Sequence, residues 1–101
     1  MKNPFDGFDK TLEHSTRLHI VSVLAANDSY DFTSLKELLQ TTDGNLATHL
    51  KALEREKYLS VVKSFVERKP NTRYKITERG RTAFKRHLEA MEALVKQQRK
   101  A

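Results

Sequence analysis

The sequence predicts a mainly helical domain with one small β-hairpin and a long C-terminal helix. Leucines recur at three- and four-residue spacings in several short segments, which is typical of amphipathic helices. Residues 59–77 are rich in β-branched and aromatic side chains around a basic turn, which is typical of two paired strands. Residues 78–98 repeat apolar side chains at heptad spacing, which predicts a long helix with one apolar seam.

The 101 residues are enough for a modest core, and we predict a single domain over residues 1–101. The sequence has no cysteine, which excludes disulfides, cysteine-ligated zinc and thiol catalysis. Its apolar stretches are shorter than a signal peptide or a membrane span requires. We therefore expect a cytoplasmic protein that does not insert into membranes.

Charge is distributed unevenly along the chain. The net charge is +6, but residues 1–50 hold four Lys and Arg against seven Asp and Glu, whereas residues 51–101 hold fifteen against six. Such a split indicates that the second half faces a polyanion. Nucleic acid and an anionic membrane surface both fit, and so does a basic surface that only keeps the protein in solution.

Three helices are predicted in the first half of the chain. Apolar residues on one face predict a helix over residues 9–26, which a polar turn cluster ends. Residues 30–32 form either a single edge strand or an extended link. A second helix is predicted over residues 34–40, and a third over residues 42–57, which Thr42 can cap. The buried side of the third helix is marked by Leu46, Leu50 and Leu53.

A basic hairpin is predicted after the third helix. Residues 59–67 form the first strand, residues 68–72 the turn, and residues 73–77 the return strand, which alternates basic and apolar side chains. The alternation is expected to turn Tyr74 and Ile76 toward the core and Arg73 and Lys75 outward.

Two short helices joined by a tight turn and followed by a ribbon have the layout of a winged helix-turn-helix. The major groove of DNA is about 12 Å wide and accepts a helix. The second of the two helices would read it with an outer face that is short and polar, and the basic ribbon would lie on the DNA backbone or in the minor groove. Taken separately, these elements are also consistent with an ordinary bundle helix and a solvated turn, but their order favours DNA.

The candidate DNA-binding residues lie on that outer face and on the ribbon. Asn45 can hydrogen-bond a base edge, and Thr48 a base or a phosphate. Lys51 and Arg55 are suited to phosphates, while the role of His49 is open because it lies beside two leucines. The full set is Thr42, Gly44, Asn45, Ala47, Thr48, His49, Lys51, Arg55, Arg68, Lys69, Asn71 and Arg73.

Three segments resemble MarR/ArsR-like winged helix-turn-helix transcriptional regulators. Residues 14–24 resemble the opening helix of that family, and residues 73–84 resemble the end of its wing, Y-x-hydrophobic-T-x-x-G-x-x-A. Residues 42–59 resemble its recognition helix, although Lys57 stands where glycine is common. The matching positions of that helix are Leu46, His49, Leu50, Leu53, Glu54, Tyr58 and Leu59.

The resemblance, which covers about residues 9–95, implies a homodimeric prokaryotic transcription regulator. It implies a recognition helix in the major groove, a wing on the minor groove or backbone, and terminal helices that form the dimer interface. It also allows an effector, whose identity is unknown. We expect no metal and no cofactor, because cysteine is absent and no two of the four histidines have the i, i+4 spacing of a ligand pair.

The apolar seam of residues 78–98 has two interpretations. The helix packs within its own chain, or it pairs with its mate in a homodimer. Such a helix is ~30 Å long, more than a small body buries, and a dimer would place two reading helices about one DNA turn, ~34 Å, apart. We therefore favour a dimer built from residues 9–26 and 78–98. Its predicted seam is Phe84, Leu88, Met91, Leu94 and Val95.

The predicted function is sequence-specific binding of duplex DNA in transcriptional regulation. We expect no enzyme, because neighbouring acids come without a phosphate loop or a nucleophile motif. The alternative is a winged-helix protein–protein interaction module within a larger assembly. Binding of RNA or single-stranded DNA is disfavoured, because the tyrosines stand at element junctions instead of forming a stacking platform.

Overall fold

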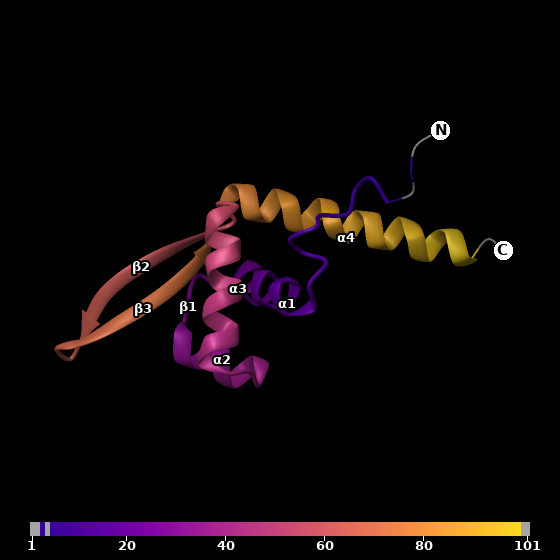
Figure 1. Ribbon diagram of the computed structural model, residues 1–101. Helices are drawn as coiled ribbons and strands as arrows, with labels where there is room; N and C mark the ends of the chain where they lie inside the picture. Colours follow the sequence, from indigo (N-terminus) through magenta and orange to yellow (C-terminus); the bar gives the residue numbers. More distant parts are fainter. Residues whose placement is uncertain (1–2, 4, 100–101) are drawn as a thin grey trace.

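The computed structural model describes residue 3 and residues 5–99, so residues 1–2, 4 and 100–101 of the predicted domain lie outside the described residues. The fold is mainly helical with one hairpin and a long C-terminal helix (Figure 1), as the sequence predicts. The elements are α1 (Ser15–Ala26), β1 (Tyr30–Asp31), α2 (Phe32–Leu39), α3 (Asp43–Arg55), β2 (Leu59–Val66), β3 (Lys69–Ile76) and α4 (Glu78–Arg99).

The sheet is antiparallel with the order β1-β3-β2. β2 and β3 pair along their whole length, from Leu59 opposite Ile76 to Val66 opposite Lys69. β1 adds only Tyr30, opposite Tyr74, and Asp31, opposite Arg73, so the edge-strand alternative for residues 30–32 is correct for two of them. Beyond Arg73 the ribbon is two-stranded and projects from the body (Figure 1).

The first helix begins later than predicted, at Ser15 instead of residue 9. The Asp9 carboxylate accepts the backbone N–H groups of Thr11 at 2.9 Å and Leu12 at 3.3 Å, which closes a turn at that point. His14 then caps the helix by accepting the N–H of Thr16. A short polar side chain that bonds its own backbone competes with helix formation, and periodicity alone does not reveal that competition.

The hairpin turn is also tighter than predicted. Glu67 and Arg68 alone form it, with φ values of 52° and 68°, so residues 69–72 belong to β3. Two left-handed residues are what a type I′ turn requires, because its twist matches that of the strands. Neither residue is the glycine or asparagine usually found there, which is why the sequence suggested a longer turn.

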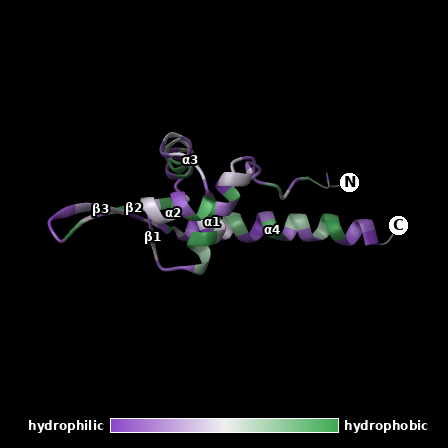
Figure 2. Cartoon of the chain, turned by 90° about the horizontal axis from the view of Figure 1, so that it is seen from below, coloured by the Kyte–Doolittle hydropathy of each residue, from purple (hydrophilic) through white to green (hydrophobic). Residues whose placement is uncertain are grey.

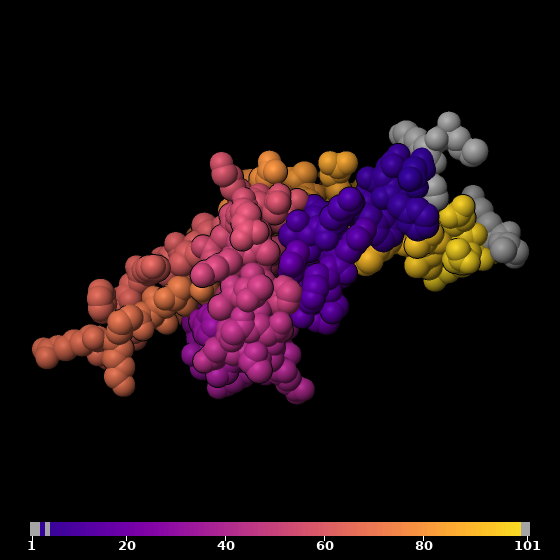
Figure 3. All heavy atoms as spheres, in the orientation of Figure 1, coloured from indigo at the N-terminus to yellow at the C-terminus, as the bar shows by residue number. Residues whose placement is uncertain are grey.

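The core gathers around α1, which packs against α3, α4 and β3. The predicted leucines of α3 are all buried, and so is Tyr74. The first half of α4 lies on this core, whereas its second half extends past the body beside the N-terminal segment (Figures 1 and 3). The buried apolar residues are Leu12, Ile20, Val21, Leu24, Leu35, Leu46, Leu50, Leu53, Tyr58, Leu59 and Tyr74.

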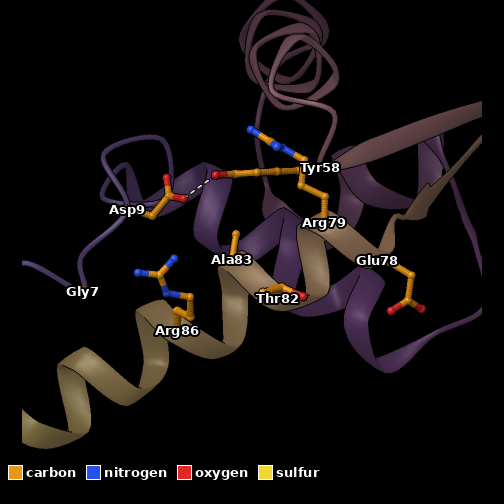
Figure 4. A pocket seen from close by; sticks show the side chains of 8 residues that line it. All are labelled: Gly7, Asp9, Tyr58, Glu78, Arg79, Thr82, Ala83 and Arg86. Atoms are coloured by element: carbon orange, nitrogen blue, oxygen red, sulfur yellow. Dashed lines mark hydrogen bonds between the residues drawn. The ribbon is translucent and has the colours of Figure 1, made fainter.

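The N-terminal segment is tied to α4 and to the base of the hairpin. The backbone N–H of Asp9 donates to Nδ1 of the buried His87 at 3.0 Å, and the Phe8 ring meets the His87 ring edge-on at 5.3 Å. The Tyr58 hydroxyl donates to the Asp9 carboxylate (Figure 4). Burial and this carboxylate raise the pKa of Tyr58 to about 12, so the phenol stays protonated as the donor.

Gly80 allows the first turn of α4 to lie against the backbone after α3. A Cβ at position 80 would overlap the carbonyl oxygen of Tyr58 and lie 2.9 Å from Cγ1 of Ile76. The same Tyr58 carbonyl accepts the N–H of Thr77 at 3.0 Å, and the Thr77 hydroxyl donates to the Lys57 carbonyl at 2.7 Å. The backbone is thus held where a side chain at position 80 does not fit.

We predict that Gly80→Ala lowers the free energy of unfolding by about 1–3 kcal/mol, because the added methyl forces α4 away from Tyr58. Urea denaturation measures the change. Gly44→Ala is the matched control, since a Cβ at position 44 meets no atom within 4 Å. An equal loss in both variants would contradict the steric explanation.

His49 lies in the interface between α3 and α1, with 6% of its surface exposed. Its Nδ1 accepts the Nε–H of Arg17 at 3.1 Å, and its ring lies against that of His14 at a tilt of 43°, with 4.1 Å between centroids. Burial, then the charges of His14 and Arg17, lower the pKa of His49 from its usual 6.5. The imidazole is therefore neutral and serves as an acceptor.

We predict that the protein loses stability as the pH falls through 6.5. The unfolded His49 binds a proton near that pH while the folded one resists it, so the unfolded state binds more protons and unfolding becomes easier. Urea midpoints measured from about pH 7.5 to 5 test the sign. In His49→Gln, whose amide oxygen can still accept from Arg17, the acid-induced loss should shrink. Identical pH profiles for the two proteins would exclude His49 as the cause.

Candidate nucleic-acid interface

α3 stands out from the layer formed by the ribbon, α1 and α4 (Figure 2). Thr42 caps it by accepting the N–H of Asn45 at 3.2 Å, as the sequence predicts, and Asp43 in the first turn suits the positive end of the helix dipole. Asp43 also pairs with Lys36 of α2 at 2.9 Å. The leucines on one side of α3 are buried in the core, which holds the helix in place and leaves its opposite side exposed to solvent.

The outer surface of α3 carries most of the predicted contact residues. Short polar side chains there bond only to their own helix or its approach: Asn45 Nδ2 donates to Thr41 Oγ1 at 2.7 Å, and the Thr48 hydroxyl donates to the Gly44 carbonyl at 2.9 Å. The space beside Gly44 is empty. Of the predicted residues, the exposed ones on α3 and its cap are Thr42, Gly44, Asn45, Thr48, Lys51 and Arg55, and Ala47 is half-buried.

His49 is the exception among the predicted residues of α3. Its burial against Arg17 and His14 removes it from the outer surface. The prediction that it contacts DNA directly is therefore corrected. The helical repeat of α3 places His49 on the same side as Leu46 and Leu50, which faces α1. His49 therefore occupies a core position, where it hydrogen-bonds Arg17.

Arg73 also differs from its prediction as an outward-facing contact. Its Nε donates to Ser29 Oγ at 2.7 Å, and Nη2 donates to the Ser29 carbonyl at 3.3 Å. Nη1 lies 3.9 Å from the carboxylate of Asp31, which itself caps α2 through Ser34 N–H. The Ser34 hydrogen bond, assisted by the Arg73 charge, lowers the pKa of Asp31. Arg73 thus joins the ribbon to β1 instead of projecting from it.

The ribbon carries other exposed cations, from Lys75 near its base, which faces outward as predicted, to its tip. Arg68 and Lys69 are exposed, as predicted, while Asn71 is half-buried. Sequence reasoning left out Lys63, which is exposed on β2, and it left out the exposed Phe65 and Val66. Lys63 and Phe65 could have been identified by continuing the two-residue alternation of β2 from Leu59 and Val61 toward the tip, where the core no longer covers the strand.

The predicted dimer seam is divided along α4. Phe84 is half-buried against the core of its own chain, so it supports the intramolecular interpretation. Leu88 and Val95 are 40% and 50% exposed, and Met91 and Leu94 between them are half-buried. The second half of α4 extends past α1 (Figure 1).

A pocket of about 410 Å³ lies between the N-terminal segment, the base of the ribbon and α4 (Figure 4). Arg79 forms one wall: its Nε donates to the Glu56 carbonyl at 2.9 Å, and its guanidinium lies 5.9 Å from the centre of the Tyr58 ring. The lining residues are Gly7, Asp9, Tyr58, Glu78, Arg79, Thr82, Ala83 and Arg86.

Within residues 3 and 5–99, no helix is long and apolar enough to cross a bilayer. In the same residues, no group of three or more His, Asp or Glu side chains is placed to hold a metal ion.

Comparison with known proteins identifies the family. Residues 16–95 match the winged helix DNA-binding domain. An uncharacterized protein of Methanocaldococcus jannaschii is 38% identical over 79 residues, which are 78% of this chain and 86% of that protein.

Solved structures agree with that match. The transcriptional regulator homologue protein from Pyrococcus horikoshii OT3 is 30% identical, with a TM-score of 0.80 and 85% of each chain covered. ZitR, a zinc-responsive MarR family member from Lactococcus lactis, is 24% identical with a TM-score of 0.63, over 84% of this chain and 58% of its own, and shows the fold alone. The chain has a MarR-like fold, as its sequence resemblance predicts, and it belongs to the winged helix DNA-binding domain family.

Proposed function

We propose that the protein is a homodimeric, sequence-specific DNA-binding regulator of transcription. The observation that carries the proposal is the outer face of α3, which combines short polar side chains with an empty space beside Gly44. A helix reads the major groove only where its backbone comes close to the base edges. The family and the Pyrococcus horikoshii regulator homologue support the same class of function.

In this proposal the first half of α3 reads bases. Asn45 and Thr48 exchange their hydrogen bonds within the chain for bonds to base edges, and the small Gly44 and Ala47 let the helix approach. Lys51 and Arg55, further along the exposed face, meet phosphates. Phosphate contacts fix the register of the helix, while base contacts supply specificity.

The wing, which is the ribbon of β2 and β3, supplies further affinity for DNA through Arg68 and Lys69. Arg73 does not contact DNA in this proposal, but its bonds to Ser29 hold the ribbon at a fixed angle to the body.

The alternative function, a protein–protein interaction module, would favour an apolar or acidic outer face on α3. The basic residues Lys51 and Arg55 argue against that alternative. A cytoplasmic location and the absence of catalysis stay predictions that follow from this role.

Two copies joined along α4 would place two such surfaces on one DNA duplex. The support is the part of α4 that extends past α1 with Leu88 and Val95 exposed. Exposed apolar residues at heptad spacing are typical of a helix that pairs with another helix. The two reading helices of such a dimer would meet successive turns of the major groove.

We predict that Asn45→Ala and Lys69→Ala weaken binding in different ways. Asn45→Ala should reduce the preference for a selected duplex over a scrambled one by about 1–3 kcal/mol, because it removes base readout. Lys69→Ala should weaken both duplexes alike and reduce the slope of log affinity against log salt by about one. Fluorescence anisotropy across a salt series, on duplexes selected from a random pool, measures both effects. Absence of duplex binding by the wild-type protein at low salt would refute the proposed function.

We predict that Leu88→Glu converts the dimer to a monomer, because it buries a charge in the apolar seam. Sedimentation velocity at micromolar concentration measures the change. Ala93→Glu is the matched control, since Ala93 is exposed on the other side of α4. A wild-type protein that sediments as a monomer would remove the dimer from the proposal.

A further inference from the structure

The tip of the wing carries an apolar side chain that the fold leaves uncovered. Phe65 is 76% exposed and Val66 is 55% exposed. The core-facing side of the ribbon runs outward from Leu59 and Val61 through Lys63 to Phe65, which is paired with Pro70. At that distance from the core, the Phe65 ring contributes little to the stability of the protein.

The turn beside Phe65 is strained. Glu67 and Arg68 both have positive φ, although residues other than glycine and asparagine rarely adopt that conformation. An Asn-Gly turn would connect the same strands without strain. Unfavourable backbone conformations cluster at sites that use them, and here they form the turn that carries Arg68 at the tip of the ribbon.

We propose that Phe65, backed by Pro70, is an apolar wedge that enters the minor groove beside the α3 site and opens a base step. The inference rests on the proposed function and adds a bend in the DNA to it. Minor-groove proteins commonly insert an apolar side chain between bases and kink the duplex toward the major groove. Arg68 in the turn and Lys69, which is paired with Val66 on the opposite face of the ribbon, give the tip the positive charge that attracts it to the minor groove.

The dimensions agree with this placement. Eight paired residues make a ribbon ~26 Å long at about 3.3 Å per residue. The next minor groove lies about half a helical turn, ~17 Å, from the major groove that α3 occupies. The ribbon therefore reaches the flanking groove while α3 stays in place. Because opening a base step is easiest at TA and CA/TG, the wedge selects flanking steps that α3 never touches.

The test compares Phe65→Ala with Phe65→Leu, which keeps an apolar side chain, and with Val62→Thr, a nearly isosteric change on the other face of the same ribbon. The probe is a duplex selected from a random pool, with 2-aminopurine in the flanking step and a donor and acceptor dye at its two ends. Affinity, 2-aminopurine fluorescence and energy transfer report binding, unstacking and bending. Urea denaturation should give all four proteins nearly the same midpoint.

Phe65→Ala is expected to bind roughly ten- to a hundredfold more weakly, because the ring no longer leaves water on binding. The salt slope should stay unchanged, since no charge is lost. The 2-aminopurine signal and the bend should disappear. Phe65→Leu should retain most of all three effects, and Val62→Thr should behave as the wild-type protein does.

Other results would overturn the wedge. If the wild-type protein binds the duplex and Phe65→Ala binds and bends it equally, the wedge is wrong and the proposed function stands. If the wild-type protein binds vesicles of anionic phospholipid and Phe65→Ala does not, the apolar tip serves a membrane. If Phe65→Ala sediments as a smaller species than the wild-type protein, the tip serves a second copy of the chain. If the wild-type protein binds no duplex, the proposed function fails, and the wedge fails with it.

Discussion

The structure depends on the close packing at Tyr58, where α3 ends and the wing begins. Its carbonyl accepts Thr77 N–H and touches the space that Gly80 leaves free, and its hydroxyl reaches Asp9 of the N-terminal segment. One residue thus fixes α3, the wing, α4 and the N-terminal segment relative to one another. Gly80 is essential because two backbones meet there, and no rearrangement of side chains can make room between them.

That packing also joins the surface we propose for DNA to the helix we propose for dimerisation. In a dimer, the distance between two reading helices depends on the angle at which α4 leaves the body. The bonds of Thr77 to Lys57 and Tyr58 set this angle, and the contact of His87 with Asp9 supports α4 a further two turns along. The pocket beside Arg79 and Arg86 lies against the same joint.

Local chemistry predicted most of the fold. The leucine spacing of α3, the Thr42 cap and the inward positions of Tyr74 and Ile76 in β3 each depend on residues a few positions apart, and each is confirmed. Local errors displaced the start of α1 and the bounds of the hairpin turn. The errors at the candidate site concern partners that are distant in sequence: Arg73 bonds Ser29, 44 positions away, and His49 bonds Arg17, 32 positions away. In the sequence Arg73 looked like a free cation and the role of His49 stayed open, since charge and periodicity do not identify a tertiary partner. Lys57, where the family pattern has glycine, has φ of 62°, so the motif preserved a backbone shape despite the different residue.

Exposed apolar side chains occur at both ends of the molecule. The long axis is 58 Å against 25 and 21 Å for the others, and the wing and the far half of α4 account for that length (Figure 1). Both project from the core, and both carry exposed apolar side chains, Phe65 on one and Val95 on the other. Exposed apolar surface on a projecting element favours association with a partner. The chemistry near each side chain is the ground on which we propose different partners: the heptad repeat of α4 favours a second copy of itself, whereas the charges of Arg68 and Lys69 at the tip that carries Phe65 favour a polyanion.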